Sequence, residues 1–192
     1  MYAISKLPVI ILSSKRTGST ALTLDITQQL MEKYGNIPHF LEPSNTILEL
    51  LSVINNTNIY VLKLHAADLH KYPNRIKTTI NTHECCLIRI RRRSIIDQIT
   101  SHYIASQRNV WTYSPQNPYN FSTEEINIDR IIRSIRVITY YNKILNRFSS
   151  IDVDLYYEDL EFTNTVFVKT PNPDNYLQIR KIIGELIPHE NI

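Results

Sequence analysis

The chain has 192 residues, a formal net charge of +3, 43% hydrophobic residues and 20% charged residues. This length suits one compact domain with a buried core, and the two fractions are those of globular proteins. No apolar run approaches the roughly 20 residues that a membrane-spanning helix needs. The short apolar run at 8–12 leads into polar and basic residues, unlike the cleavage site of a secretory signal. We therefore expect one soluble, cytoplasmic domain over residues 1–192 with no membrane contact.

The positive charge is compatible with anionic ligands but is too small to indicate nucleic-acid binding, so we expect no specific nucleic-acid partner. The distribution of the basic residues is more informative than their number. They are concentrated at 15–16 and at 89–93, and each group directly follows an apolar, strand-like run. Both groups could therefore face the same anion.

The first half of the chain alternates apolar runs with helical patterns. We predict, in order, a strand at 8–13, a helix at about 20–34, a strand at 58–65, a strand at 85–90 and a helix from 94 towards 107. The first helix carries an apolar stripe at helical spacing, made of Leu22, Ile26 and Leu30. Gly35 suits the C-terminus of this helix, and Ser94 suits the N-terminus of the second one.

The cysteines of the chain are Cys85 and Cys86, which are adjacent in the sequence. Both fall in a predicted buried strand, whose successive side chains point to opposite faces of the sheet. We therefore expect reduced core residues rather than a disulfide.

The second half of the chain begins with a polar segment at 112–120, which we interpret as a loop or lid. Ser122 and Glu125 match a capping box at the start of a long helix. The apolar positions predicted to share one face of this helix are Ile128, Ile131, Ile135, Ile138 and Leu145. A strand and turn at 153–160 and a helix at about 174–186 complete the chain. Strands that alternate with helices favour a three-layer α/β domain with a central, mainly parallel sheet flanked by helices.

The loop between the first predicted strand and helix, "SSKRTGSTAL" at 13–22, is the best candidate for an anion site. Gly18 allows close approach of the backbone to a ligand, and the start of the helix favours negative charge. Arg16 supplies a cation, while three neighbouring hydroxyls can donate hydrogen bonds: Thr17, Ser19 and Thr20. The loop lacks G-x-x-x-x-G-K-[ST], so it does not indicate the magnesium-dependent chemistry of nucleoside triphosphatases. An ordinary strand-to-helix turn is the alternative interpretation.

The sequence "RTGST" within this loop resembles the phosphosulfate-binding motif of sulfotransferases that use 3′-phosphoadenosine 5′-phosphosulfate (PAPS). A second segment, "RRRSIIDQITSHYIASQRNVW" at 91–111, is similar to the second nucleotide-binding segment of this family, and especially of bacterial trehalose sulfotransferases. The resemblance implies a P-loop-like version of the predicted fold, with Arg93 and Ser101 as ligands of the 3′-phosphate. Trp111 matches a tryptophan of the family. Considered alone, the arginines could form a solvated edge or a polyanion-binding patch.

A third segment, "YYEDL" at 156–160, resembles the "YEDL" segment common in sulfotransferases. The resemblance implies that Tyr157 contacts the adenine ring, while Glu158 and Asp159 organise the fold. A packed tyrosine with one polar tip is the alternative for Tyr157.

Sulfuryl transfer requires a general base near the acceptor hydroxyl. Lys63 and His65 end the second long predicted strand and resemble the K-x-H arrangement of cytosolic sulfotransferases, in which lysine assists the leaving side and histidine is the base. Glu42 is the alternative base, because the trehalose-type enzymes use a glutamate from the region after the first helix. A hydrogen-bonded strand-end histidine without catalytic function also fits His65.

The expected reaction is therefore transfer of a sulfuryl group from PAPS to a hydroxyl of a carbohydrate or other small acceptor, which leaves adenosine 3′,5′-bisphosphate. An aromatic sugar-binding surface could be built from Trp111, Tyr113 and Tyr119. We expect no metal requirement, because cationic side chains and backbone donors can balance the leaving group.

Three alternatives stay open at this stage. One is a P-loop-like phosphotransferase, which would depend on ATP and magnesium. Another is a non-catalytic protein that binds nucleic acid through arginines of the 89–93 run, namely Arg89, Arg91, Arg92 and Arg93. The third is a degenerate sulfotransferase that binds the nucleotide without turnover.

Overall fold

The computed structural model describes residues 4, 6–40, 59–82, 84–109, 111, 124–161 and 172–187. The strands are β1 (Val9–Ser13), β2 (His39–Phe40), β3 (Val61–His65), β4 (Cys86–Arg91) and β5 (Val153–Tyr156). The helices are α1 (Ser19–Tyr34), α3 (Ala66–Lys71), α4 (Pro73–Thr82), α5 (Ile95–Arg108), α6 (Ile128–Leu145), the 3-10 turn η1 (Tyr157–Asp159) and α7 (Tyr176–Leu186). The strands form one sheet in the order β2-β3-β1-β4-β5, and every neighbouring pair is parallel. The predicted α/β class and parallel sheet are therefore confirmed.

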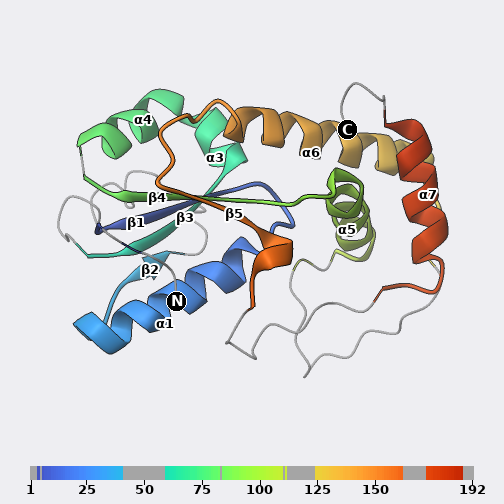
Figure 1. Ribbon diagram of the computed structural model, residues 1–192. Helices are drawn as coiled ribbons and strands as arrows, with labels where there is room; N and C mark the ends of the chain where they lie inside the picture. The colour runs from blue at the N-terminus through green and yellow to red at the C-terminus, as the bar shows by residue number, and fades with distance from the viewer. Residues whose placement is uncertain are drawn as a thin grey trace.

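Alternate residues of the strands point to two separate cores on the two faces of the sheet. On one face, β1, β3 and β4 pack against α1 through residues that include Val9, Ile11 and Ile88, with Leu22 and Ile26 from the helix. The other face packs against α3, α4 and the C-terminal end of α6. Figure 1 shows α1 below the sheet and α3, α4 and α6 above it, which gives the three layers.

Cys85 and Cys86 illustrate this alternation. Both are buried free thiols, and Cys85 belongs to the core beside α3 and α6, while Cys86 belongs to the core beside α1. Successive side chains of an extended chain point to opposite faces, so the expectation of two reduced core residues is confirmed.

A third apolar cluster lies beyond the sheet and joins α5, α6 and α7. Its fully buried members include Ile99 and Tyr103 of α5, Ile131 of α6 and Ile183 of α7. Figure 1 shows α5 and α7 beside one end of the sheet, where β1 and β4 finish. The cluster therefore holds α5 against the edge at which the strands end.

The predicted start of the long helix is wrong. Helix α6 begins at Ile128, and its N-cap is Asn127, whose side chain accepts a hydrogen bond from the backbone N–H of Arg130. Glu125 precedes the helix, and Ser122 lies outside the described residues. Ile128 is 44% exposed and does not share the buried face. The Asn127 side chain provides an acceptor for the Arg130 N–H, which has no partner inside the helix, and the helix therefore begins directly after Asn127.

Several elements were not predicted. Strand β2 has only two residues, and α3 and α4 occupy the crossover between β3 and β4. In contrast, the stripe of α1 is buried as predicted, Gly35 caps α1 with a φ of 79°, and Ser94 caps α5 through a bond from the Asp97 N–H. No helix within the described ranges is long and apolar enough to cross a membrane.

The topology defines one edge of the sheet as the place for a ligand. From β1 the chain passes through α1 to β2, on the β3 side of the sheet, whereas from β4 it passes through α5 and α6 to β5, on the opposite side. Connections that diverge in this way leave a crevice at the carboxyl ends of the two strands, and ligands of open α/β sheets bind there. The loop 14–18 and the start of α5 both lie at this edge.

Candidate anion-binding site

The loop between β1 and α1 has a conformation suited to anions. Arg16 and Gly18 both adopt left-handed backbone angles, with φ values of 63° and 74°. Such angles are uncommon for residues other than glycine, and loops that contain them can aim successive N–H groups at an anion. The Thr17 hydroxyl donates to the Ser14 carbonyl at 2.9 Å, and Gln98 of α5 donates to the Lys15 carbonyl at 2.7 Å. The loop is thus held from within and from α5.

The N-terminus of α1 also favours negative charge. Gly18 occupies the N-cap without a side-chain hydrogen bond, and the first turn of the helix, which starts at Ser19 and Thr20, contains no acidic residue. The first backbone N–H groups of a helix have no partner inside the helix, and the helix dipole adds positive potential there. This end of α1 can therefore donate hydrogen bonds to a bound anion.

Arg16 connects the loop with α5. Its Nε atom donates to the Ser101 hydroxyl at 3.0 Å, and one terminal nitrogen donates to the Trp111 carbonyl at 2.6 Å. Burial lowers the pKa of the Arg16 guanidinium, and the nearby Arg92 lowers it further. The structure therefore brings together Arg16 and Ser101, two predicted nucleotide ligands from segments 85 residues apart.

Lys63 brings a buried cation to the same edge. Its side chain is only 1% exposed, and its Nζ atom donates to the Thr20 hydroxyl at 2.9 Å. The residue lies on β3, which is hydrogen-bonded to β1, so the ammonium group reaches the start of α1 from the neighbouring strand. Lysine is rarely buried without a compensating interaction, and a cation in this position is well suited to stabilise negative charge on a ligand.

His65 ends β3 directly beside the end of β1, where it is in register with Ser13. Its Nδ1 atom lies 3.2 Å from the Ser13 hydroxyl, and it forms a reciprocal capping box with Asp68 at the start of α3. Burial lowers the pKa of His65 to about 4, with further contributions from Lys63 and Lys15, while a hydrogen bond with the Ser13 backbone acts in the opposite direction. The imidazole is therefore neutral at pH 7 and can accept a proton.

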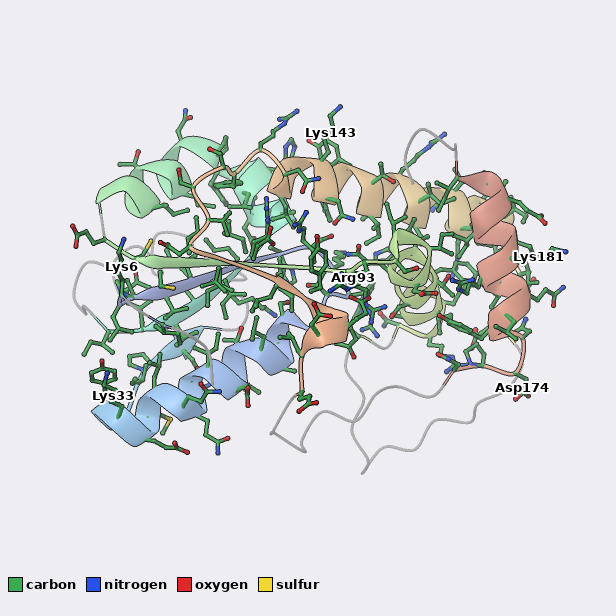
Figure 2. All side chains as sticks on the ribbon, in the orientation of Figure 1. Lys6, Lys33, Arg93, Lys143, Asp174 and Lys181 are labelled. Atoms are coloured by element: carbon green, nitrogen blue, oxygen red, sulfur yellow. The ribbon has the colours of Figure 1, made fainter. Side chains whose placement is uncertain are left out.

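Arg93 is bound to the turn η1. It forms an ion pair with Asp159 at 2.5 Å, and its backbone N–H donates to Glu158 at 3.1 Å. Its side chain is 58% exposed, and no hydrogen bond joins it to Ser101. Figure 2 shows Arg93 near η1, at the end of the sheet. Among the described residues, Arg93 is thus paired with Asp159 and Ser101 with Arg16.

Tyr157 lies beside Arg92. The guanidinium carbon of Arg92 lies 4.4 Å from the centroid of the Tyr157 ring, and the Nε atom of Arg92 is buried without a hydrogen-bond partner within the described ranges. Sequence reasoning placed Arg92 only in a general basic patch. One signal could have identified it: strand alternation puts Arg92 on the same side as the buried Ile90 and opposite Arg91.

His102 is a second group that sequence reasoning missed. It is 6% exposed, its Nδ1 atom lies 3.0 Å from the Ser134 hydroxyl of α6, and its ring centroid is 5.5 Å from that of Trp111. Burial lowers the pKa of His102 to about 4, with contributions from Lys15 and then Arg16. No sequence motif singles out this histidine, because its position depends on the packing of α5 against α6.

The aromatic residue Trp111 borders the basic loop. The Nζ atom of Lys15 lies 5.0 Å from the centroid of its ring, and the ring is 42% exposed. The alternative base Glu42 and the aromatic candidates Tyr113 and Tyr119 lie outside the described residues. Within the described ranges, no group of three or more histidine, cysteine or acidic residues could hold a metal ion.

We define the cationic site by four residues at or near the ends of adjacent strands: Lys15 and Arg16 of the loop 14–18, Lys63 of β3, and Arg92 directly after β4. Its neutral donors and acceptors come from Thr20, Ser101, the half-buried His65 and the buried His102. Comparison of the chain with models of known protein families and with curated protein sequences finds no match.

Proposed function

We propose that the chain is a PAPS-dependent sulfotransferase that transfers a sulfuryl group to a hydroxyl of a carbohydrate or other small acceptor. The observation that carries the proposal is the hydrogen bond of 3.0 Å between Arg16 and Ser101. It joins the segment that resembles the phosphosulfate-binding loop to the segment that resembles the second nucleotide-binding motif. Both resemblances were assigned from sequence, and a nucleotide with two separate anionic ends needs both at one place.

The charge of the site supports a ligand with several negative charges. The charge of Arg92 lowers the pKa of Arg16. The charges of Lys63 and Lys15 lower the pKa of His65. The charges of Lys15 and Arg16 lower the pKa of His102. Four cations at the end of one sheet match a nucleotide that carries a phosphosulfate and a separate phosphate. In a site with little solvent such groups stabilise negative charge more strongly than in water.

The proposed reaction is an in-line transfer at sulfur. The acceptor oxygen forms a new bond to sulfur, while the bond between sulfur and the bridging oxygen of the phosphosulfate breaks. The electron pair of that bond stays on the bridging oxygen, which becomes part of the 5′-phosphate of adenosine 3′,5′-bisphosphate. The proton of the acceptor hydroxyl passes to the general base. Arg16 and the loop amides would stabilise the leaving phosphate, and Lys63 would stabilise its bridging oxygen.

His65 is our first candidate for the base, with Glu42 as the alternative. A neutral imidazole can accept the proton, and the position of His65 beside Ser13 places it at the carboxyl edge. Lys63 and Lys15 both lower its pKa. A bound anion would compensate these cations and raise the pKa, which would make His65 a stronger base in the complex than in the free protein.

The polyanion-binding alternative is less well supported by the surface charges. Asp154 pairs with both Arg89 and Arg91, at 2.5 and 2.6 Å. Arg93 pairs with Asp159. A nucleic-acid phosphate would have to displace these carboxylates, so the run 89–93 offers less free positive charge than its sequence indicates.

The decisive experiment is calorimetric titration of the chain with adenosine 3′,5′-bisphosphate, with 5′-AMP and ATP as controls and without added metal. We expect tighter binding of the bisphosphate than of 5′-AMP, since the separate 3′-phosphate adds a charged contact worth about tenfold in affinity or more. Equal binding of all three nucleotides would contradict the proposal. Binding of ATP only in the presence of magnesium would favour a phosphotransferase instead.

A further inference from the structure

Arg92 is a cation of the site with an unused hydrogen-bond donor. Its Nε atom is buried and has no hydrogen-bond partner in the described part of the chain. We propose that Arg92, supported by the ring of Tyr157, binds the second anionic group of the nucleotide, and that Arg93 does not. This inference rests on the proposed function, because it names the residue that distinguishes a 3′,5′-bisphosphate from a 5′-monophosphate.

The geometry of the guanidinium favours this role. Its central carbon lies 4.4 Å from the centroid of the Tyr157 ring. An arginine that rests against an aromatic ring uses its face for that contact, while its N–H donors lie in the plane of the group and stay available. Those donors match two oxygens of a phosphate, and such bidentate bonds are stronger than bonds between neutral groups. Tyr157 would thereby orient the arginine rather than contact adenine itself.

Arg93 is less suited to the same task. Its guanidinium is paired with Asp159 at 2.5 Å and lies 4.5 Å from the ring of Tyr156. The charge of Arg93 is therefore compensated, and its side chain is more than half exposed. To bind a phosphate it would have to release the carboxylate, and water would weaken the new contact.

The position of Arg92 on the sheet also favours this role. Ser13, the last residue of β1, is in register with Ile90 of β4. Arg16 follows Ser13 by three residues, and Arg92 follows Ile90 by two, so both leave adjacent strands at the same edge. Arg92 lowers the pKa of Arg16, which indicates that the two positive charges interact.

Two interacting guanidiniums repel each other unless an anion compensates them. No ion pair joins Arg16 or Arg92 to a carboxylate of the described residues. Instead, Arg16 interacts electrostatically with the hydroxyl of Tyr157. Arg92 interacts in the same way with the hydroxyl of Tyr176. Bringing like charges together has a cost in free energy, which a protein can retain where it serves function. A phosphate between the two groups would remove this repulsion.

The test uses two matched substitutions, Arg92→Met and Arg93→Met, in the full chain. Calorimetric titration with adenosine 3′,5′-bisphosphate and with 5′-AMP measures each. We expect Arg92→Met to weaken binding of the bisphosphate by about tenfold or more and to change binding of 5′-AMP by less than about twofold. Arg93→Met should change neither by more than about twofold. The reverse pattern would overturn the inference.

Thermal unfolding of the same variants separates binding from folding. Because Arg92→Met removes an uncompensated charge and keeps a side chain that packs against Tyr157, we expect an unchanged or higher Tm without nucleotide. A lower Tm together with weaker binding of both nucleotides would show a structural role and would overturn the inference. If Arg92→Met does not fold, Arg92→Lys serves instead: it keeps the charge but loses the planar fork, and it should weaken only the bisphosphate.

The two proposals can fail separately. If the wild-type chain does not prefer the bisphosphate over 5′-AMP, the proposed function fails and the inference with it. If the wild-type chain does prefer it, and Arg92→Met and Arg92→Lys keep that preference, the function stands and only the assignment of Arg92 fails.

Discussion

The ammonium group of Lys63 on β3 lies 2.9 Å from the hydroxyl of Thr20 in the first turn of α1. This contact brings a cation that is 1% exposed to the end of the helix that receives the ligand in our proposal. The neighbouring strand thus contributes to a site that the sequence assigns mainly to one loop. Replacement of Lys63 therefore tests directly whether this cation takes part in the proposed chemistry.

Replacing Lys63 with methionine should reduce turnover with PAPS by about 100-fold or more, because a preorganised charge at the leaving group is lost. The free energy of unfolding should decrease, because the Thr20 hydroxyl loses the buried donor that lies 2.9 Å away. Steady-state kinetics and urea unfolding measure the two effects. Lys6→Met is the control: its Nζ atom lies 3.9 Å from Asp152, its side chain is 51% exposed, and neither property should change. Full turnover by Lys63→Met would show that Lys63 has no role in the reaction.

The Ser101→Ala substitution tests the contact between Arg16 and α5. Loss of the hydroxyl leaves the Arg16 Nε atom without the acceptor that holds it at 3.0 Å, so binding of adenosine 3′,5′-bisphosphate should weaken by about fivefold to tenfold. Ser106→Ala on the same helix removes a hydroxyl that, within the described part of the chain, bonds only to the Tyr103 carbonyl, and it should leave binding unchanged. Equal effects of the two substitutions, measured by calorimetric titration, would argue against a specific role of Ser101.

The two candidate bases predict different kinetics. If His65 is the base, His65→Gln should lower kcat by roughly 100-fold or more and leave the affinity for the nucleotide within about threefold. If Glu42 is the base, Glu42→Gln should produce that loss and His65→Gln should stay active. Circular dichroism and Tm of each variant serve as the check of folding, because His65 also caps α3.

The buried histidines predict how stability depends on pH. Folding lowers the pKa of both His65 and His102 from 6.5 to about 4, mainly because burial disfavours the charged imidazole. Between these values the unfolded chain binds more protons than the folded chain, so the free energy of unfolding decreases as the pH falls from 6.5 to 4. Above pH 6.5 this contribution is fully present. Each histidine contributes on the order of 3 kcal/mol at pH 7.

Urea unfolding at several pH values checks this dependence. His102→Gln should reduce the slope between pH 6.5 and 4. Folding lowers the pKa values of Asp97 and Asp154 below 3.8. Protonation of these carboxylates therefore reduces the free energy of unfolding only at lower pH than protonation of the histidines does. A slope that does not respond to substitution of His102 would contradict the proposed burial of a neutral imidazole.

Sequence reasoning performed well where a local pattern and the tertiary packing agree. The apolar stripe of α1 faces the sheet, and Ser94 caps α5 as the spacing predicted. It failed where a local pattern competed with another one, as at the start of α6, where Asn127 rather than Ser122 begins the helix. It also missed α3 and α4, two short helices in the crossover between β3 and β4.

In the candidate site, too, local patterns identified some residues, while others depend on tertiary contacts. The loop 13–22 could be identified because a glycine, a cation and several hydroxyls follow one strand and precede one helix. The assignment of Ser101 could also be made from a motif, and the structure brings it to Arg16. In contrast, strand alternation is the one sequence signal that separates Arg92 from Arg93, and the tertiary structure adds their different partners, Tyr157 and Asp159.

The sequence by itself determined the alternation of strands and helices, the two faces on which Cys85 and Cys86 are buried, and the position of a basic loop after the first strand. These follow from periodicity and from residue types that act over a few positions. Only the tertiary structure decided which charges are compensated. Asp154 neutralises Arg89 and Arg91 from an adjacent strand 65 and 63 residues away. Charge compensation depends on distance in space and on burial, and neither can be read from neighbours in the chain.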